Sequence, residues 1–224
     1  MPALRVLLTA FGSFPGAPVN PTMAIARRVE RRHGRRLTRL GVELHTAVLP
    51  VVYEGAEARG SALISALQPH VVLHLGLAAR RKKLSFETRA RNRLNVLHPD
   101  AARQNAGRFL IAPQGPHARA SRAPVARCVA AISKTGAVCA ASIDAGDYLC
   151  NQTLYASLGE SVPIVAFLHV PKPRRLRAPR KGRADKGWAR KITLDDKITL
   201  DEMAEGAFAA IVEMAKAARR QSAA

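Results

Sequence analysis

Short apolar runs, separated by longer amphipathic stretches, constrain the fold of this chain more than any other feature. Residues 4–10, 71–75 and 164–168 are apolar almost throughout and are followed closely by Gly or Pro, as is typical of strands buried on both faces of a parallel sheet. The alternation of strand-like and helix-like segments indicates an α/β domain with layered helices and sheet. Further strands are expected at 42–49 and 138–143, and helices at 22–36, 54–67, 124–134 and 151–158.

The C-terminal segment carries the clearest helix signal. Thr199 and Glu202 have the spacing of a capping box, in which each side chain bonds the other residue's backbone N–H. Residues 171–189 hold three prolines and many basic residues and are expected to form a loop. Because no change of composition marks a linker, a single domain is predicted over residues 1–224. Apolar side chains recur at helical spacing after the cap, at Leu200, Met203, Ala207, Phe208, Ile211 and Met214.

The charge of the chain is unusual. Its 36 Lys and Arg outnumber 16 Asp and Glu, for a formal net charge of +20 at pH 7. Such an excess attracts nucleic acids and other polyanions through long-range, salt-sensitive forces. Aromatic residues make up only 4% of the chain, however, and no recognition motif accompanies the basic segments 27–39, 80–93 and 172–191. We therefore expect a solvated basic face, with nucleic-acid binding kept as the alternative.

Cysteine content and hydropathy indicate in which cellular compartment the protein is expected. The three cysteines, Cys128, Cys139 and Cys150, are odd in number and lack C-x-x-C spacing, so neither a disulfide framework nor a metal site is predicted. No apolar run approaches the roughly 20 residues of a membrane-spanning helix, and the N-terminus lacks signal-peptide architecture. We expect a cytoplasmic protein with no membrane partner.

Cys150 and His169 are the best candidates for chemistry. Cys150 follows a turn signal at 145–147 and leads into the helix expected at 151–158; a helix N-terminus carries partial positive charge, which favours a thiolate. His169 follows the apolar run 164–168, and parallel-sheet enzymes place catalytic groups at the carboxyl ends of strands. A thiol and an imidazole in these positions have the roles of nucleophile and base. The alternative is that Cys150 is a small buried apolar residue.

A third group is needed to orient the base, and Glu87 is the candidate because it follows the short apolar stretch 84–86. Cys128 and Cys139 are expected to be structural. His74 lies within an apolar run and is expected to pack in the core. The remaining histidines occur in polar or turn contexts without a partner pattern: His33, His45, His70, His98 and His117.

Six motifs in order along the chain resemble those of the pyroglutamyl peptidase I family, also called pyrrolidone-carboxylate peptidases. The similarity runs from the N-terminus to the C-terminal helix. The motifs are Thr9-Ala10-Phe11-Gly12-Ser13-Phe14, Val19-Asn20-Pro21-Thr22, Leu49-Pro50-Val51, residues 68–77 (QPHVVLHLGL), Ala145-Gly146-x-Tyr148-x-Cys150-Asn151 and Phe167-x-His169-Val170-Pro171.

The resemblance implies a fold and an activity. The fold is a single three-layer α/β/α sandwich around a mixed, mostly parallel sheet, often assembled as a homo-tetramer. The activity is removal of an N-terminal pyroglutamyl residue from a peptide by thiol acyl transfer, with no metal or cofactor. The family's nucleophile, base and acid fall on Cys150, His169 and Glu87. Four residues are implied to contact substrate: Phe11, Phe14, Leu149 and Arg81.

The segment from Arg80 to Ala101 departs from the family pattern. Arg80 stands where the family has Gly, and Thr88 where it has Arg. Arg89, Arg91 and Arg93 replace apolar residues; they would share the face of Glu87 if one strand ran through this segment. An acid and an arginine are lost within residues 95–101, and Asp144 replaces a serine. These changes leave two alternatives open: a thiol amidohydrolase with an altered substrate, and a basic binding protein that has lost peptidase activity.

Overall fold

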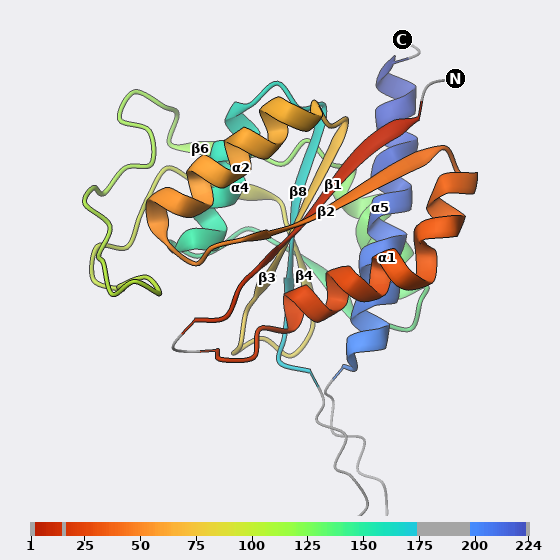
Figure 1. Ribbon diagram of the computed structural model, residues 1–224, viewed down its shortest axis with the longest axis horizontal. Helices are drawn as coiled ribbons and strands as arrows, with labels where there is room; N and C mark the ends of the chain where they lie inside the picture. The colour runs from red at the N-terminus through yellow and green to blue at the C-terminus, as the bar shows by residue number, and fades with distance from the viewer. Residues whose placement is uncertain (1–2, 15–16, 174–197, 223–224) are drawn as a thin grey trace, which may run out of the picture.

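A six-stranded sheet forms the centre of the computed structural model, which describes residues 3–14, 17–173 and 198–222 (Figure 1). The strand order is β2-β1-β3-β8-β4-β7. The first four strands in this order are parallel, whereas β4 is antiparallel to β8 and parallel to β7. The sheet is therefore mixed and mostly parallel, as expected. The strands are β1 (Leu4–Phe11), β2 (Val42–Leu49), β3 (Val71–Leu77), β4 (Leu84–Glu87), β7 (Cys139–Ser142) and β8 (Ile164–Val170).

Helices cover both faces of the sheet, so the expected α/β/α sandwich is confirmed (Figure 1). One face packs against α1 (Pro21–Arg39), α3 (Val125–Ser133) and α5 (Leu200–Ser222). The other face packs against α2 (Tyr53–Leu67) and α4 (Leu149–Gly159).

The two central strands explain why the chain forms this sheet. All seven residues of β8 are buried, and in β3 only the last residue is partly exposed. Successive side chains of a strand alternate between faces. Accordingly, Leu73 and Leu75 enter the apolar core beneath α1 and α5, whereas Val72 enters the core beneath α2 and α4. Both faces must be covered, and the helix layers on either side of this sheet cover them.

Element boundaries differ from the expected ones by up to three residues, the largest difference being the end of α1 at Arg39 instead of residue 36. The strand at 42–49 is confirmed with the same bounds in β2. Helix α4 begins at Leu149, two residues earlier than expected, so Cys150 lies inside its first turn rather than before it. Strand β8 continues to Val170, so His169 lies within the last two residues of the strand.

No single strand runs from Glu87 through Arg93, so the condition under which Arg89, Arg91 and Arg93 would share the face of Glu87 is not met. Strand β4 ends at Glu87, and β5 (Arg89–Arg91) pairs instead with β6 (Ala118–Ala120) in a separate two-stranded sheet. Thr88 is the corner: its N–H and hydroxyl both donate to the Ser142 carbonyl, at 2.7 and 3.0 Å. The Arg89 and Arg91 side chains bond Ile143 and Asp144. They therefore do not continue the line of side chains on the Glu87 face of β4.

The capping box at the start of α5 is confirmed. Glu202 N–H donates to Thr199 Oγ1, and Thr199 N–H donates to Glu202 Oε2 at 2.7 Å. Most of the loop expected at 171–189 lies outside the described residues. Among the described helices, none combines the length and apolar character needed to cross a membrane.

Candidate active site

Cys150 is placed against the centre of the sheet at its carboxyl edge. It is the second residue of α4, and Gly146, with φ of 84°, allows the turn that leads into this helix. Its Sγ fills space left by the missing side chain of Gly76: a Cβ on Gly76 would lie 2.9 Å from Sγ. Gly76 is the register partner of His169 in the β3–β8 pair. The fold therefore brings the cysteine and histidine to one place.

Glu87 reaches His169 from the neighbouring strand. The antiparallel register pairs Ser85 with His169, so Glu87, two residues further along β4, lies on the same face. Its Oε1 is 2.8 Å from His169 Nδ1, and both residues are buried. A bond at Nδ1 leaves Nε2 as the nitrogen available for proton transfer, as in other nucleophile–base–acid triads.

Arg81 supports the carboxylate of Glu87 while its own side chain remains partly exposed. Its guanidinium donates to Glu87 Oε1 at 2.6 Å and to the Asp144 carbonyl at 2.6 Å. The Oε2 atom of Glu87 is buried and makes no hydrogen bond. The expected contact of Arg81 with substrate stays a prediction; its described contacts provide the fully buried Glu87 with a positive partner.

Burial determines the protonation states of Cys150 and His169 before substrate binds. It raises the pKa of the Cys150 thiol to about 12, helped by the negative charge of Glu87 and opposed by Arg81. Burial also lowers the pKa of His169, although the bond to Glu87 opposes this shift. At neutral pH the pair is therefore a thiol and a neutral imidazole. The expectation that the helix N-terminus would favour a thiolate fails because desolvation outweighs it.

Asn151, the residue after the cysteine, has a role that the sequence analysis did not assign. Its amide group is fully buried and bonds the backbone of β5 and the residues after it. Nδ2 donates to the Arg91 and Arg93 carbonyls at 2.8 and 2.9 Å, and Oδ1 accepts from Arg91 N–H at 2.8 Å. These three bonds fasten the start of α4 to the two-stranded sheet. Only its place beside Cys150 in the motif could have marked it.

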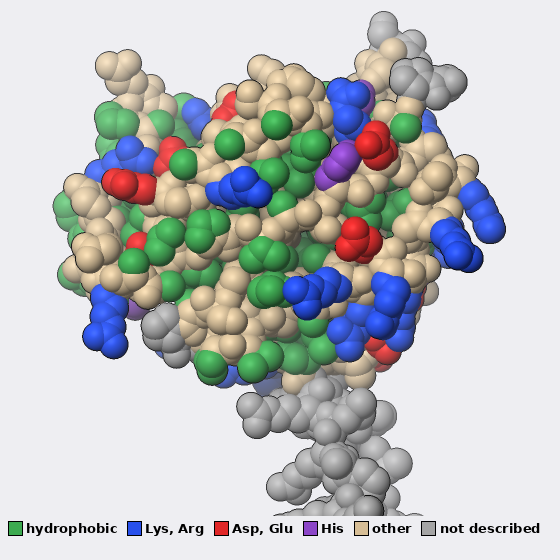
Figure 2. Space-filling model, viewed as in Figure 1, with side chains coloured by type: hydrophobic (Ala, Val, Ile, Leu, Met, Phe, Trp, Pro, Cys, Tyr) green, Lys and Arg blue, Asp and Glu red, His purple; other side chains and the backbone are tan. Residues whose placement is uncertain are grey.

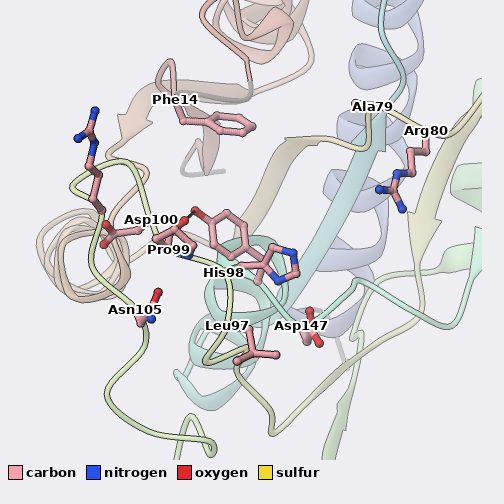
Figure 3. Close-up of a pocket in the computed structure, with 11 residues that line it drawn as sticks. Phe14, Ala79, Arg80, Leu97, His98, Pro99, Asp100, Asn105 and Asp147 are labelled. Atoms are coloured by element: carbon pink, nitrogen blue, oxygen red, sulfur yellow. Dashed lines mark hydrogen bonds between the residues drawn. The ribbon is translucent and has the colours of Figure 1, made fainter.

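A large cavity of about 1040 Å³ adjoins the site (Figure 3). Phe14, after β1, lies across it from His98 and Pro99, and Tyr148 lies two residues before Cys150. Of the residues expected to contact substrate, only Phe14 lines this cavity. The full lining is Phe14, Ala79, Arg80, Leu97, His98, Pro99, Asp100, Arg103, Asn105, Asp147 and Tyr148.

Phe11 and Leu149 lie beneath the site in the apolar core. They are 4% and 1% exposed, and the Phe11 and Phe167 rings are 6.4 Å apart. Their expected substrate contacts stay predictions. As placed, they support the floor on which Cys150 and His169 rest.

The acidic groups of the cavity are already engaged. Asp100 accepts backbone N–H groups from Tyr53, Ala102 and Gln104, and Asp147 accepts from the Asn95 amide. These bonds tie the 95–104 segment to the start of α2 and to the turn before Cys150.

His74, His33 and Cys128 line neither the cavity nor the Glu87–His169 contact. His74 is fully buried between Thr9 and Ser157, at 2.7 and 3.0 Å, and burial lowers its pKa to about 3, so it is a core residue as predicted. His33 does have a partner, contrary to expectation: Nε2 lies 3.0 Å from Glu205. Burial raises the pKa of Cys128 to about 12. The described residues contain no group of three or more His, Cys, Asp or Glu arranged to hold a metal ion.

Comparison with known proteins agrees with this geometry. The profile of the pyroglutamyl peptidase family matches residues 4–177. The pyrrolidone-carboxylate peptidase of Pyrococcus furiosus is 30% identical over 178 residues, covering 75% of this chain and 81% of that protein. The enzyme of the same name from Pseudomonas fluorescens is 32% identical over 169 residues, covering 74% and 78%.

Solved structures share the fold. Pyroglutamyl peptidase I of Bacillus amyloliquefaciens superposes with a TM-score of 0.76 at 24% identity, covering 95% of this chain and 97% of that one. A mutant pyrrolidone carboxyl peptidase from Pyrococcus furiosus gives a TM-score of 0.78 at 25% identity, covering 96% and 99%. From the extent of the profile match and the shared fold, the chain belongs to the pyroglutamyl peptidase family.

Proposed function

We propose that this protein is a cysteine peptidase that removes an N-terminal pyroglutamyl residue from peptides. The observation that carries the proposal is the bond between Glu87 and His169 Nδ1 beside the Gly76 position that receives the Cys150 thiol. Proteins named for this activity are the relatives that the chain matches over three quarters of its length.

Acyl transfer would begin from a neutral pair. His169 Nε2 removes the thiol proton as Cys150 Sγ attacks the pyroglutamyl carbonyl, and Glu87 stabilises the imidazolium that forms. The imidazolium then protonates the amine of the departing peptide, which leaves a thioester on Sγ. His169 next activates a water molecule, whose attack releases pyroglutamate and restores the thiol.

The negative oxygen of the tetrahedral intermediate needs donors, and the first turn of α4 has them. The first N–H groups of a helix lack an intrahelical carbonyl. We propose that those of Leu149, Cys150 and Asn151 donate to the developing charge, which the helix dipole also stabilises. In other enzymes, each such donor lowers the activation barrier by about 3–4 kcal/mol.

Substrate placement follows from the cavity. We propose that Phe14 contacts the flat, uncharged lactam ring, with Phe11 and Leu149 forming the apolar floor beneath it. The peptide beyond the scissile bond would lie along the cavity past Tyr148. No metal or cofactor is needed for any step.

Two further expectations are part of the proposal. A cytoplasmic location suits a site whose thiol must stay reduced, and the three cysteines are free in the structure. A homo-oligomer is also proposed, and light scattering during size-exclusion chromatography measures its mass.

The test is hydrolysis of a fluorogenic pyroglutamyl amide by the reduced protein. Wild type should release the fluorophore, whereas Cys150→Ser should not, because a hydroxyl is a far poorer nucleophile here. Cys139→Ser is the matched control and should behave as wild type. Turnover retained by Cys150→Ser would disprove the nucleophile, and no release by wild type would disprove the activity.

A second candidate is the thiol amidohydrolase with an altered substrate. The observation that favours it is the cavity lining: Arg80 and the 82%-exposed Leu97 lie where the family pattern has Gly and Arg. A panel of matched dipeptide amides, blocked by pyroglutamyl, acetyl or formyl groups, distinguishes the two. Faster cleavage of any other blocked amide than of the pyroglutamyl one would favour the second candidate.

A further inference from the structure

One of the three basic segments of the chain, residues 27–39, lies in α1. This helix contains seven arginines and one acidic residue, Glu30. The chain as a whole carries a formal charge of +20. Peptide hydrolysis at the proposed site uses none of these arginines, because the site is built from β4, β8 and α4.

Four of the arginines form a row on the outer side of the helix, which we call the arginine row: Arg27, Arg31, Arg35 and Arg39. They recur every four residues, and all are exposed. At 1.5 Å per residue, successive members are about 6 Å apart along the axis and the row is about 18 Å long. With 100° per residue, the row lies opposite the buried face of the helix. That face includes Ile25, Val29, His33 and Leu37.

The arginine row has no ion-pair partner in the described part of the chain. None of its members takes part in a described ion pair. The nearby arginines differ: Arg28 and Arg32 both pair with Asp201 at 2.9 Å, and Arg36 lies over the Phe208 ring.

The acidic residues around α1 are engaged elsewhere. Glu30 accepts a hydrogen bond from the Thr46 hydroxyl, Glu43 lies 3.1 Å from His45, and Glu205 bonds His33. Figure 2 shows the result, with Lys and Arg side chains gathered where α1 crosses the lower right of the molecule.

We propose that the arginine row binds the phosphodiester backbone of nucleic acid without regard to base sequence. Guanidinium groups bind phosphate oxygens in a bidentate manner, and a regular row of them suits a polymer that carries one negative charge per nucleotide. α1 contains no Phe, Tyr or Trp to stack on bases, and the His33 ring is buried against Phe208, so the contact is to the backbone alone.

A membrane surface fits the row less well than a nucleic acid. A helix that lies on a bilayer inserts an apolar face, and the apolar face of α1 is occupied by the sheet and α5. The row also lies on the layer opposite α4, so a bound polyanion would leave the peptidase site open.

The measurement is fluorescence anisotropy of a labelled duplex of about 20 base pairs at several salt concentrations. Four phosphate contacts give a slope of log K against log salt of about −3.6, a loss in affinity of about 150-fold between roughly 50 and 200 mM salt. A duplex of scrambled sequence should bind equally well.

The decisive variant is Arg31→Gln/Arg35→Gln, which removes two charges from the row. Its slope should become less steep by about two units. The matched control is Arg59→Gln/Arg103→Gln, which removes two exposed charges from α2 and from the 97–105 segment; its slope should not change. Circular dichroism melts verify that both proteins are folded.

Three results would overturn the proposal. One is no duplex binding by the wild type at about 50 mM salt, where phosphate contacts are strong. Another is an equal change of slope in the two double variants, which would mean diffuse attraction by net charge. The third is binding to vesicles containing phosphatidylserine but not to duplex. Because no peptidase assay is involved, each outcome is independent of the proposed activity.

Discussion

Gly76→Ala tests the packing on which the proposed catalysis depends. The new Cβ would lie 2.5 and 2.6 Å from Cζ and Cε1 of Phe167 and 2.9 Å from Cys150 Sγ. Carbon contacts become favourable at about 3.5 Å, so the ring must retreat by about 1 Å. That retreat is blocked, because Phe167 is fully buried and its ring centroid is 4.7 Å from that of His169.

The added methyl group therefore displaces both the nucleophile and the base. A misplacement of this size costs about 100-fold in kcat, and overpacking a buried site lowers the free energy of unfolding by about 1–3 kcal/mol. We expect KM to change little, since Gly76 does not line the cavity. The assays are turnover of the pyroglutamyl amide and urea unfolding.

Gly60→Ala is the matched control, because a Cβ at this position in α2 would meet nothing within 4 Å. It should keep wild-type turnover and gain about 0.5–1 kcal/mol of stability. If Gly76→Ala retains wild-type kcat while folded, the thiol does not rest against this glycine. Should the variant fail to fold, Phe167→Leu in the same background makes room for the methyl group and tests the same contact.

Three other perturbations address the carboxylate, the cavity and the far end of α4. In Glu87→Gln, the pKa of His169 falls because the negative charge that raises it is lost, so the acid limb of the kcat/KM profile moves to lower pH. Turnover should fall about 100-fold. An acid limb that moves to higher pH would refute the assignment of Glu87. Phe14→Ala should raise KM more than it lowers kcat; an unchanged KM would exclude Phe14 from the substrate pocket. Arg122→Ala removes three hydrogen bonds to the Leu158, Glu160 and Val162 carbonyls. It should lower the free energy of unfolding in urea by about 1–3 kcal/mol, and the activity per folded molecule should stay at the wild-type value.

The sheet and its helices could be predicted from sequence because their signals are local. Strands buried on both faces read as continuous apolar runs, and the capping box of Thr199 and Glu202 marks the start of α5 at Leu200. Two of the three proposed catalytic residues could also be selected from sequence, because Cys150 and His169 follow recognisable turn and strand patterns.

What the sequence did not reveal depends on contacts between distant segments. The β5–β6 pair consists of two three-residue strands 26 residues apart, too short to show alternation. The hydrogen bond from the Asn151 side chain to the Arg93 carbonyl joins residues 58 positions apart along the chain, and the His33–Glu205 contact joins residues 172 positions apart. The protonation of Cys150 depends on burial, which the helix-dipole argument alone could not include.

The protonated state of Cys150 has a consequence for chemical durability. Oxidants and alkylating reagents react with thiolate rather than thiol. A thiol with a pKa of about 12 exposes almost no thiolate at neutral pH, so the resting enzyme should be alkylated slowly. Reactivity then arises only when His169 takes the proton during attack. Such a peptidase tolerates peroxide between turnovers and becomes vulnerable mainly while it is working.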